Sequence, residues 1–201
     1  MHEPPHHFTR AGSIAMAGIL LLLSGCGINN IPTQKQQVNA AWSQVLNEYQ
    51  RRTDLIPNLV ATVKGYAAHE ASVLEAVTEA RAKVTQTNIP SDILTNPKAF
   101  RAFEQNQATL GGALSRLMVV TENYPNLKAD QNFLTLQAQL EGTENRIAVA
   151  RRDYILAVQQ YDTELTTIPG RWYRSLFYSS SQPIQNFNIS EQAQQAPQVK
   201  F

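Results

Sequence analysis

The sequence predicts an all-α fold: an elongated antiparallel helical bundle of three long helices, followed by an extended C-terminal tail. Apolar residues recur at spacings of three and four over long segments, and prolines and glycines lie at the junctions between these segments. No sustained alternation of apolar and polar residues precedes residue 170, so no strand is expected there. Connections of about a dozen residues or fewer favour antiparallel packing of successive helices.

The first helical pattern contains a proline that a straight helix tolerates poorly. Pro57 lacks the N–H of a helical hydrogen bond, and its ring collides with the carbonyl group of Thr53. We expect a kink at Pro57, or a brief break at which Asp54 caps a second helix, so the bundle has three to four helices. Thr33 is the expected N-cap. The apolar stripe continues on both sides of Pro57 and comprises Val38, Trp42, Val45, Tyr49, Ile56, Val60, Val63, Ala67, Leu74, Val77 and Val84.

Two further patterns complete the bundle. Asn96-Pro97 opens a helix that Asn123-Tyr124-Pro125 closes, and its stripe is Phe100, Phe103, Gln107, Leu110, Leu114, Leu117 and Thr121. The third pattern runs to Ile168, where Pro169-Gly170 ends it, through Phe133, Leu136, Leu140, Ile147, Tyr154, Val158, Tyr161 and Leu165. The bundle is therefore expected to span residues 33–169.

The N-terminal region has the features of a secretory signal. Residues 11–23 are uncharged and mostly apolar, and Arg10 precedes them. A run of 13 residues is shorter than the roughly 20 residues that cross a bilayer as a helix. It fits the apolar part of a signal peptide better. We expect residues 1–25 to be a signal peptide and residues 26–32 to be a short tether.

The four residues at the end of this run resemble the lipobox of bacterial lipoproteins. Leu23, Ser24 and Gly25 precede Cys26, the only cysteine of the chain. The resemblance implies cleavage before Cys26 and attachment of a diacylglyceryl group to its thiol; two or more acyl chains give stable anchoring. The body would then face the periplasm or the cell exterior. The alternative is a single N-terminal transmembrane helix that keeps the run, with a body that can face the cytoplasm.

Composition excludes several functions. The net charge of +1 comes from 17 basic and 16 acidic residues spread along the chain, so no nucleic-acid partner is expected. With one cysteine and one histidine, His69, in the main body, no metal site is expected. His69 has no second histidine four residues later, and no phosphate-binding glycine loop occurs. We therefore expect no enzymatic activity and no cofactor.

Two polar clusters interrupt or flank the apolar stripes. The first consists of Arg51, Asp54 and Asn58, and the second contains Glu144, Arg151, Arg152 and Asp153. We expect an interhelical network of ion pairs that fixes the register of the bundle. The alternative is a polar binding groove.

The tail, residues 170–201, differs from the bundle. It begins with an aromatic segment that carries two arginines and becomes rich in glutamine, so we expect an extended, poorly ordered chain. The aromatic segment fits packing over the end of the bundle, or contact with a membrane interface or a partner. Its residues are Arg171, Trp172, Tyr173, Arg174, Phe177 and Tyr178.

Three motifs resemble those of LemA family proteins: RRTDLIPNLV at 51–60 continuing as TVKGYAAHE at 62–70, YPNLKA at 124–129, and ENRIA at 144–148 followed by ARRDY at 150–154. The chain also ends as the family does, with Pro197, Val199 and Phe201. The resemblance covers residues 34–201. It implies a membrane-anchored antiparallel helical bundle without an established enzymatic activity or cofactor. Many members carry one N-terminal transmembrane helix, often with a cytoplasmic body, and the lipobox departs from that pattern.

These features together predict a structural or adaptor lipoprotein of the bacterial envelope, held by its N-terminal lipid and engaging another envelope protein. Two alternatives remain: an accessory or enzyme-associated protein of envelope hydrolysis that uses His69, and a membrane-remodelling protein. The oligomeric state is not predicted.

Overall fold

The computed structural model describes residues 27–187, which form six α-helices and no strands. The all-α prediction is confirmed. The helices are α2 (Asn30–Tyr66), α3 (Ala71–Gln86), α4 (Pro97–Thr121), α5 (Pro125–Lys128), α6 (Gln131–Thr166) and α7 (Gly170–Phe177). The proposed signal peptide, Cys26 and residues 188–201 lie outside the described residues. Within the described part, none of the helices is both long and apolar enough to span a membrane.

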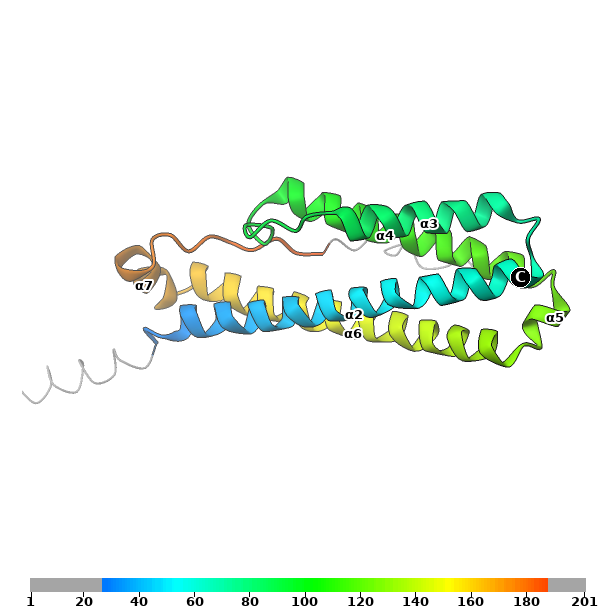
Figure 1. Ribbon diagram of the computed structural model, residues 1–201. Coiled ribbons are helices and arrows are strands. Elements are labelled where there is room, and N and C mark those ends of the chain that lie inside the picture. Colours follow the sequence, from blue (N-terminus) through cyan, green and yellow to red (C-terminus); the bar gives the residue numbers. More distant parts are fainter. Residues whose placement is uncertain (1–26, 188–201) are drawn as a thin grey trace, which may run out of the picture.

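The two longest helices, α2 and α6, form the frame of the molecule and lie side by side (Figure 1). The two helices are antiparallel, because the start of each one contacts the end of the other. Asn30 at the start of α2 donates to Glu164 near the end of α6 at 3.4 Å, and Tyr66 at the end of α2 donates to Asp130 at 2.9 Å. Helices α3 and α4 cover the part of this pair that contains the end of α2. The chain after α7 runs over the remaining part.

The core consists of two apolar clusters arranged along the frame. One cluster joins the first half of α2, the start of α4, the second half of α6 and the segment after α7. The other joins the second half of α2, α3, the second half of α4, α5 and the first half of α6. All seven stripe residues predicted for α4 are buried. Three stripe positions elsewhere, Val60, Val84 and Leu136, are only half-buried, and Leu59 is buried beside Val60.

Two outcomes were expected at Pro57; the break is wrong, because α2 continues through this residue, and the kink stays a prediction. Pro57 cannot donate a hydrogen bond to the Thr53 carbonyl, four residues earlier. Arg81 of α3 supplies a donor instead: its Nε lies 3.3 Å from the Thr53 oxygen. A side chain from a neighbouring helix thus satisfies the carbonyl that the proline leaves free.

The chain reverses ten residues later, at Ala67–Glu70. The N–H of Ala67 closes α2 on the Val63 carbonyl, and Glu70 accepts from the Tyr124 hydroxyl at 3.0 Å. Tyr66 lies opposite Asp130, where α6 begins. If α2 continued straight past Tyr66, Leu74 would therefore extend beyond α6 and have no helix to pack against. The reversal folds α3 back onto α2 and buries Leu74 in the second cluster.

Both ends of the predicted bundle also differ from expectation. Helix α2 begins at Asn30, so Thr33 is not its N-cap and part of the expected tether is helical. Pro32 lies in the first turn, where its missing N–H costs no helical hydrogen bond. The start of the tail is not extended but forms α7. Gly170 is required there, because a Cβ at this position would lie 2.0 Å from the Glu164 carbonyl oxygen.

The segment after α7 forms no helix or strand up to Phe187, and it is packed on the bundle. Ile184 and Phe187 are buried in the first cluster. The Gln185 backbone donates to the Leu94 carbonyl at 2.7 Å and accepts from the Tyr154 hydroxyl at 2.6 Å. These contacts make residues 181–187 part of the core rather than a loose tail.

The contact at Pro57 gives a testable coupling. Arg81→Met should lower the free energy of unfolding by about 1 kcal/mol, because the buried Thr53 carbonyl loses its donor. In a Pro57→Ala background the cost should be smaller, because an alanine at this position restores the helical N–H. Urea denaturation of the four proteins measures the coupling, with Arg101→Met on the exposed face of α4 as the control. Equal costs in both backgrounds would refute this account of the proline.

Candidate functional site

A layer of buried polar side chains lies between the two apolar clusters. Five of the seven buried polar residues in the described part of the chain belong to it: Glu48, Arg52, Thr53, Gln107 and Thr143. The layer crosses α2, α4 and α6 at the positions where one cluster ends and the other begins. Buried polar groups need partners, so the layer restricts how the helices can meet.

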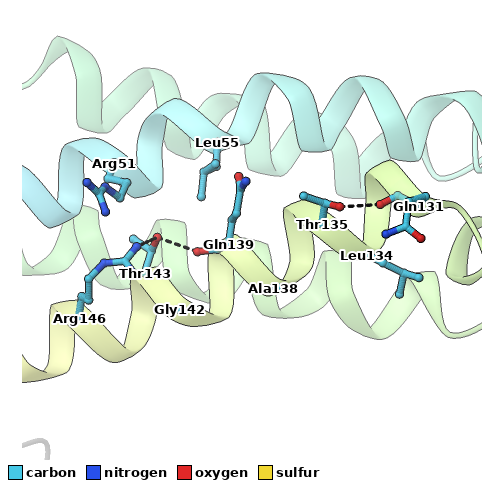
Figure 2. Close-up of a pocket in the computed structure, with 10 residues that line it drawn as sticks. All are labelled: Arg51, Leu55, Gln131, Leu134, Thr135, Ala138, Gln139, Gly142, Thr143 and Arg146. Carbon is cyan, nitrogen blue, oxygen red and sulfur yellow. Dashed lines mark hydrogen bonds between the residues drawn. The ribbon is translucent and has the colours of Figure 1, made fainter.

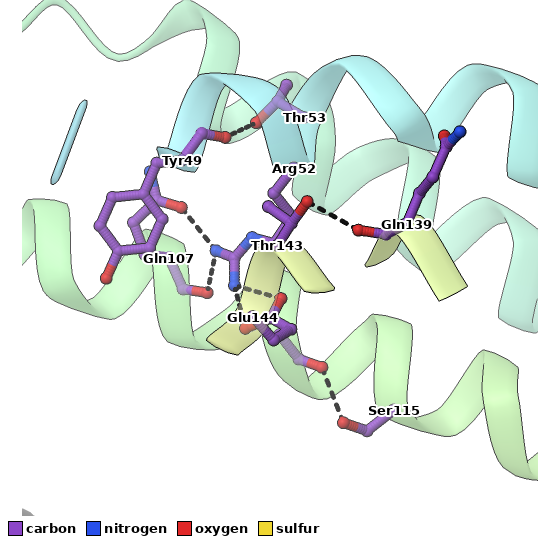
Figure 3. Close-up of polar contacts among 9 residues, drawn as sticks. Tyr49, Arg52, Thr53, Gln107, Ser115, Gln139, Thr143 and Glu144 are labelled. Carbon is purple, nitrogen blue, oxygen red and sulfur yellow. Dashed lines mark hydrogen bonds and ion pairs between the residues drawn. The ribbon is translucent and has the colours of Figure 1, made fainter. Parts of the chain in front are cut away.

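Arg52 is the centre of this layer and is 3% exposed. Its Nη2 donates to both the carbonyl oxygen and the side-chain Oε1 of Gln107 on α4, at 3.1 and 2.7 Å. Its Nη1 donates to Glu144 on α6 at 3.1 Å. Figure 3 shows the guanidinium group between these partners, so one side chain joins three helices. A planar guanidinium group suits this task because it presents several donors in fixed directions.

A second ion pair of opposite polarity lies one turn away. Arg146 of α6 donates from Nε to the buried Glu48 carboxylate of α2 at 3.0 Å and from Nη2 to Thr143 at 2.8 Å. A slip of about one turn would bring Arg146 towards Arg52 in one direction, or Glu48 towards Glu144 in the other. Like charges would then meet in a partly buried environment, which costs free energy. The two pairs therefore specify the register of α2 against α6.

Tyr49 lies beside the polar layer with its hydroxyl group protonated and uncharged. Tyr49 lies with its ring 5.0 Å from the Arg52 guanidinium carbon. Burial raises the pKa of the Tyr49 hydroxyl, although the positive charges of Arg151 and Arg52 act in the opposite direction. The ring thus packs against Arg52 without adding a charge to the layer.

The predicted polar residues do not form a single network. Of these, Glu144 belongs to the layer. Arg51, Asp54 and Asn58 are exposed, and Asp54 accepts from Gln50 at 2.7 Å. The arginine at the centre is Arg52, the neighbour of the predicted Arg51.

The other predicted arginines lie elsewhere. Arg152 is exposed and pairs with its neighbour Asp153 at 3.3 Å. Arg151 lies over the ring of Phe187, with its guanidinium carbon 4.5 Å from the ring centroid. One signal in the sequence does identify Arg52. The apolar stripe of α2 skips from Tyr49 to Ile56, and Arg52 occupies the missing helical position.

An open groove of about 840 Å³ runs between α2 and α6 beside this layer (Figure 2). Arg51 and Arg146 lie at one end, and Gln131 and Leu134 lie at the other. The lining combines guanidinium, amide and hydroxyl groups with apolar surface, a mixture suited to holding a protein segment. The remaining lining residues are Leu55, Thr135, Ala138, Gln139, Gly142 and Thr143. The groove thus lies directly beside the polar layer, and Thr143 and Arg146 belong to both.

His69 lies exposed in the turn between α2 and α3, away from the polar layer and the groove. Among residues 27–187, no three His, Cys, Asp or Glu side chains gather as a potential metal-binding group.

Comparison with known proteins adds a family and a set of relatives. The family model described as LemA family matches residues 41–201. Two proteins of Paramagnetospirillum magneticum, magnetosome proteins MamQ 1 and MamQ 2, are each 27% identical to this chain over 157 residues. Magnetosome protein MamQ of Magnetospirillum gryphiswaldense is 24% identical over the same length. Each match covers 70% of this chain but only 58% of the relative, less than two thirds of its length.

Two adjacent arginines provide a matched test of the polar layer. Arg52→Ala should lower the free energy of unfolding by about 2 kcal/mol, because it leaves the buried Gln107 without its donor and removes the ion pair with Glu144. Arg51→Ala should change it by less than about 0.5 kcal/mol, because Arg51 is exposed. Chemical denaturation followed by circular dichroism measures both. Similar losses in the two variants would show that Arg52 does not hold the helices together.

Proposed function

Because this chain belongs to the LemA family, we propose that it is a membrane-anchored, non-enzymatic structural or adaptor protein of the bacterial envelope. The observation that carries the proposal is the single arginine, Arg52, that joins α2, α4 and α6. Such a junction favours a stiff, elongated antiparallel bundle with a defined register. A stiff bundle suits a protein that holds a partner at a set distance from a surface.

The distance follows from the geometry of α2. The proposed anchor, Cys26, immediately precedes Gly27, and α2 begins at Asn30. At a rise of about 1.5 Å per residue, Arg51 lies about 30 Å along the helix from Asn30. The groove extends from Arg51 towards Gln131 at the start of α6, so it occupies the half farther from the anchor. We therefore assign anchoring to one end and partner binding to the other half.

The partner expected in the groove is a segment of another envelope protein with apolar and acidic side chains. Leu134 is exposed on the groove and offers an apolar contact, while Arg51 offers an exposed positive charge. A complementary segment would bury the leucine and pair with the arginine.

The lipid anchor is tested by Cys26→Ala. In the unchanged chain the mature N-terminus should be Cys26 carrying the mass of the diacylglyceryl group, whereas the variant lacks the thiol, gains no lipid mass and should retain residues 1–25, because cleavage at a lipobox depends on the lipidated cysteine. Mass spectrometry of the N-terminus and fractionation of cells give the two readouts, and protease protection of intact cells reports the side of the membrane. An unchanged chain that retains residues 1–25 and carries no lipid on Cys26 would favour the transmembrane alternative.

The groove is tested by photo-crosslinking in cells. A benzoylphenylalanine residue at Leu134 should give a discrete adduct with another protein, whereas the same residue at Val149 should not. Both positions are exposed on α6, but only Leu134 lines the groove. Identical adducts from both positions, or none from either, would count against the groove as a binding surface. An adduct of twice the chain's mass would show that the groove binds a second copy of this chain instead of another envelope protein.

A further inference from the structure

The segment 168–177, which contains α7, carries an unusual concentration of exposed apolar side chains. Ile168, Trp172, Leu176 and Phe177 are each between 59% and 73% exposed. They are four of the ten large apolar residues exposed in residues 27–187, yet they lie within ten consecutive positions. Trp172 and Leu176 are one helical turn apart, so they share a face. An apolar patch concentrated in this way indicates a contact with something other than water.

The patch is held firmly on the body. Tyr173 of α7 packs against the first apolar cluster. Arg174 donates from Nε to the Ser181 carbonyl at 3.0 Å. The close approach of Gly170 to Glu164 fixes the start of the helix against α6. Exposure of the apolar face is therefore a consequence of how α7 is docked.

The position of α7 indicates what covers this face. A Cβ built on Gly27 would lie 3.0 Å from the ring of Tyr173 and 3.6 Å from Pro169. The chain therefore passes directly beside α7 where it leaves Cys26 and the apolar run at 11–23. Figure 1 shows α7 and the start of α2 at the same end of the bundle.

A positive charge lies beside the apolar patch. Arg171 is exposed on α7 and can pair with an anionic lipid headgroup. Tryptophan and arginine beside an apolar face are typical of segments in the headgroup layer of a bilayer.

We propose that α7 lies in the headgroup layer of the membrane that anchors the chain, with Trp172, Leu176 and Phe177 inserted at the boundary of the acyl chains. This inference rests on the proposed anchoring. A helix of eight residues is short for binding on its own, but the adjacent anchor gives it a high effective concentration at the membrane. Two attachment points at one end then restrict the tilt of the bundle.

The fluorescence of Trp172 tests the proposal in the full chain. The chain has two tryptophans, and the other, Trp42, is buried among aromatic rings. The chain is reconstituted into vesicles of phosphatidylethanolamine and phosphatidylglycerol whose acyl chains carry bromine, a contact quencher. We expect loss of the Trp172 emission, identified as the component absent from Trp172→Phe. Emission from Trp172 that stays unquenched in chains that float with the vesicles overturns the inference and leaves the anchoring intact.

A pair of double variants supplies the matched control and retains Trp172 as the probe. Leu176→Ser with Phe177→Ser should reduce the quenching. The patch then loses two apolar side chains, so α7 inserts less deeply and Trp172 lies farther from the brominated acyl chains. Val149→Ser with Leu156→Ser removes two exposed apolar side chains from α6 and should leave quenching unchanged. Equal quenching in both pairs overturns the inference. Chains that do not float with the vesicles at all overturn the proposed anchoring as well.

Discussion

The burial of one positive charge constrains the whole bundle. Arg52 is enclosed by three helices, and its position is acceptable only where Gln107 and Glu144 both reach it. Apolar surfaces would tolerate sliding of the helices, because apolar contacts are not directional. A buried guanidinium group does not tolerate sliding, because an unpaired buried charge costs several kcal/mol. The polar layer therefore contributes specificity of packing to a core whose free energy of burial comes from the apolar clusters on either side.

The layer also divides the molecule into two parts with different surfaces. On one side, the segment after α7 completes the core, and α7 presents apolar side chains beside the point where residues 1–26 join the body. On the other side, α3 and α4 complete the core, and the groove between α2 and α6 stays open. The frame thus carries an exposed apolar patch near one end and an open groove towards the other, and these are the surfaces that we propose for the membrane and for a partner.

The sequence predicted an ion-pair network between the helices, but it identified few of the residues that form it. Glu144 was identified, but Arg52 and Glu48 were missed because the motif places Arg51 and Arg52 side by side, and only helical phase distinguishes them. Phase is readable from the stripe, in which Arg52 fills the gap between Tyr49 and Ile56. The partner on α4, Gln107, was predicted as a stripe residue, but its bond to Arg52 joins residues 55 positions apart. Sequence spacing contains no information on such a contact.

Local signals determined the all-α class, the stripes and the boundaries of α4, where Asn96 caps the helix by accepting from Lys98 and Ala99. These features depend on residues within one or two turns. Only the tertiary structure decided that α2 continues through Pro57 and that residues 170–177 form a docked helix. In the first case Arg81, 28 residues away, satisfies the freed carbonyl. In the second, contacts with α6 and the start of α2 hold a segment whose composition alone predicts an extended chain.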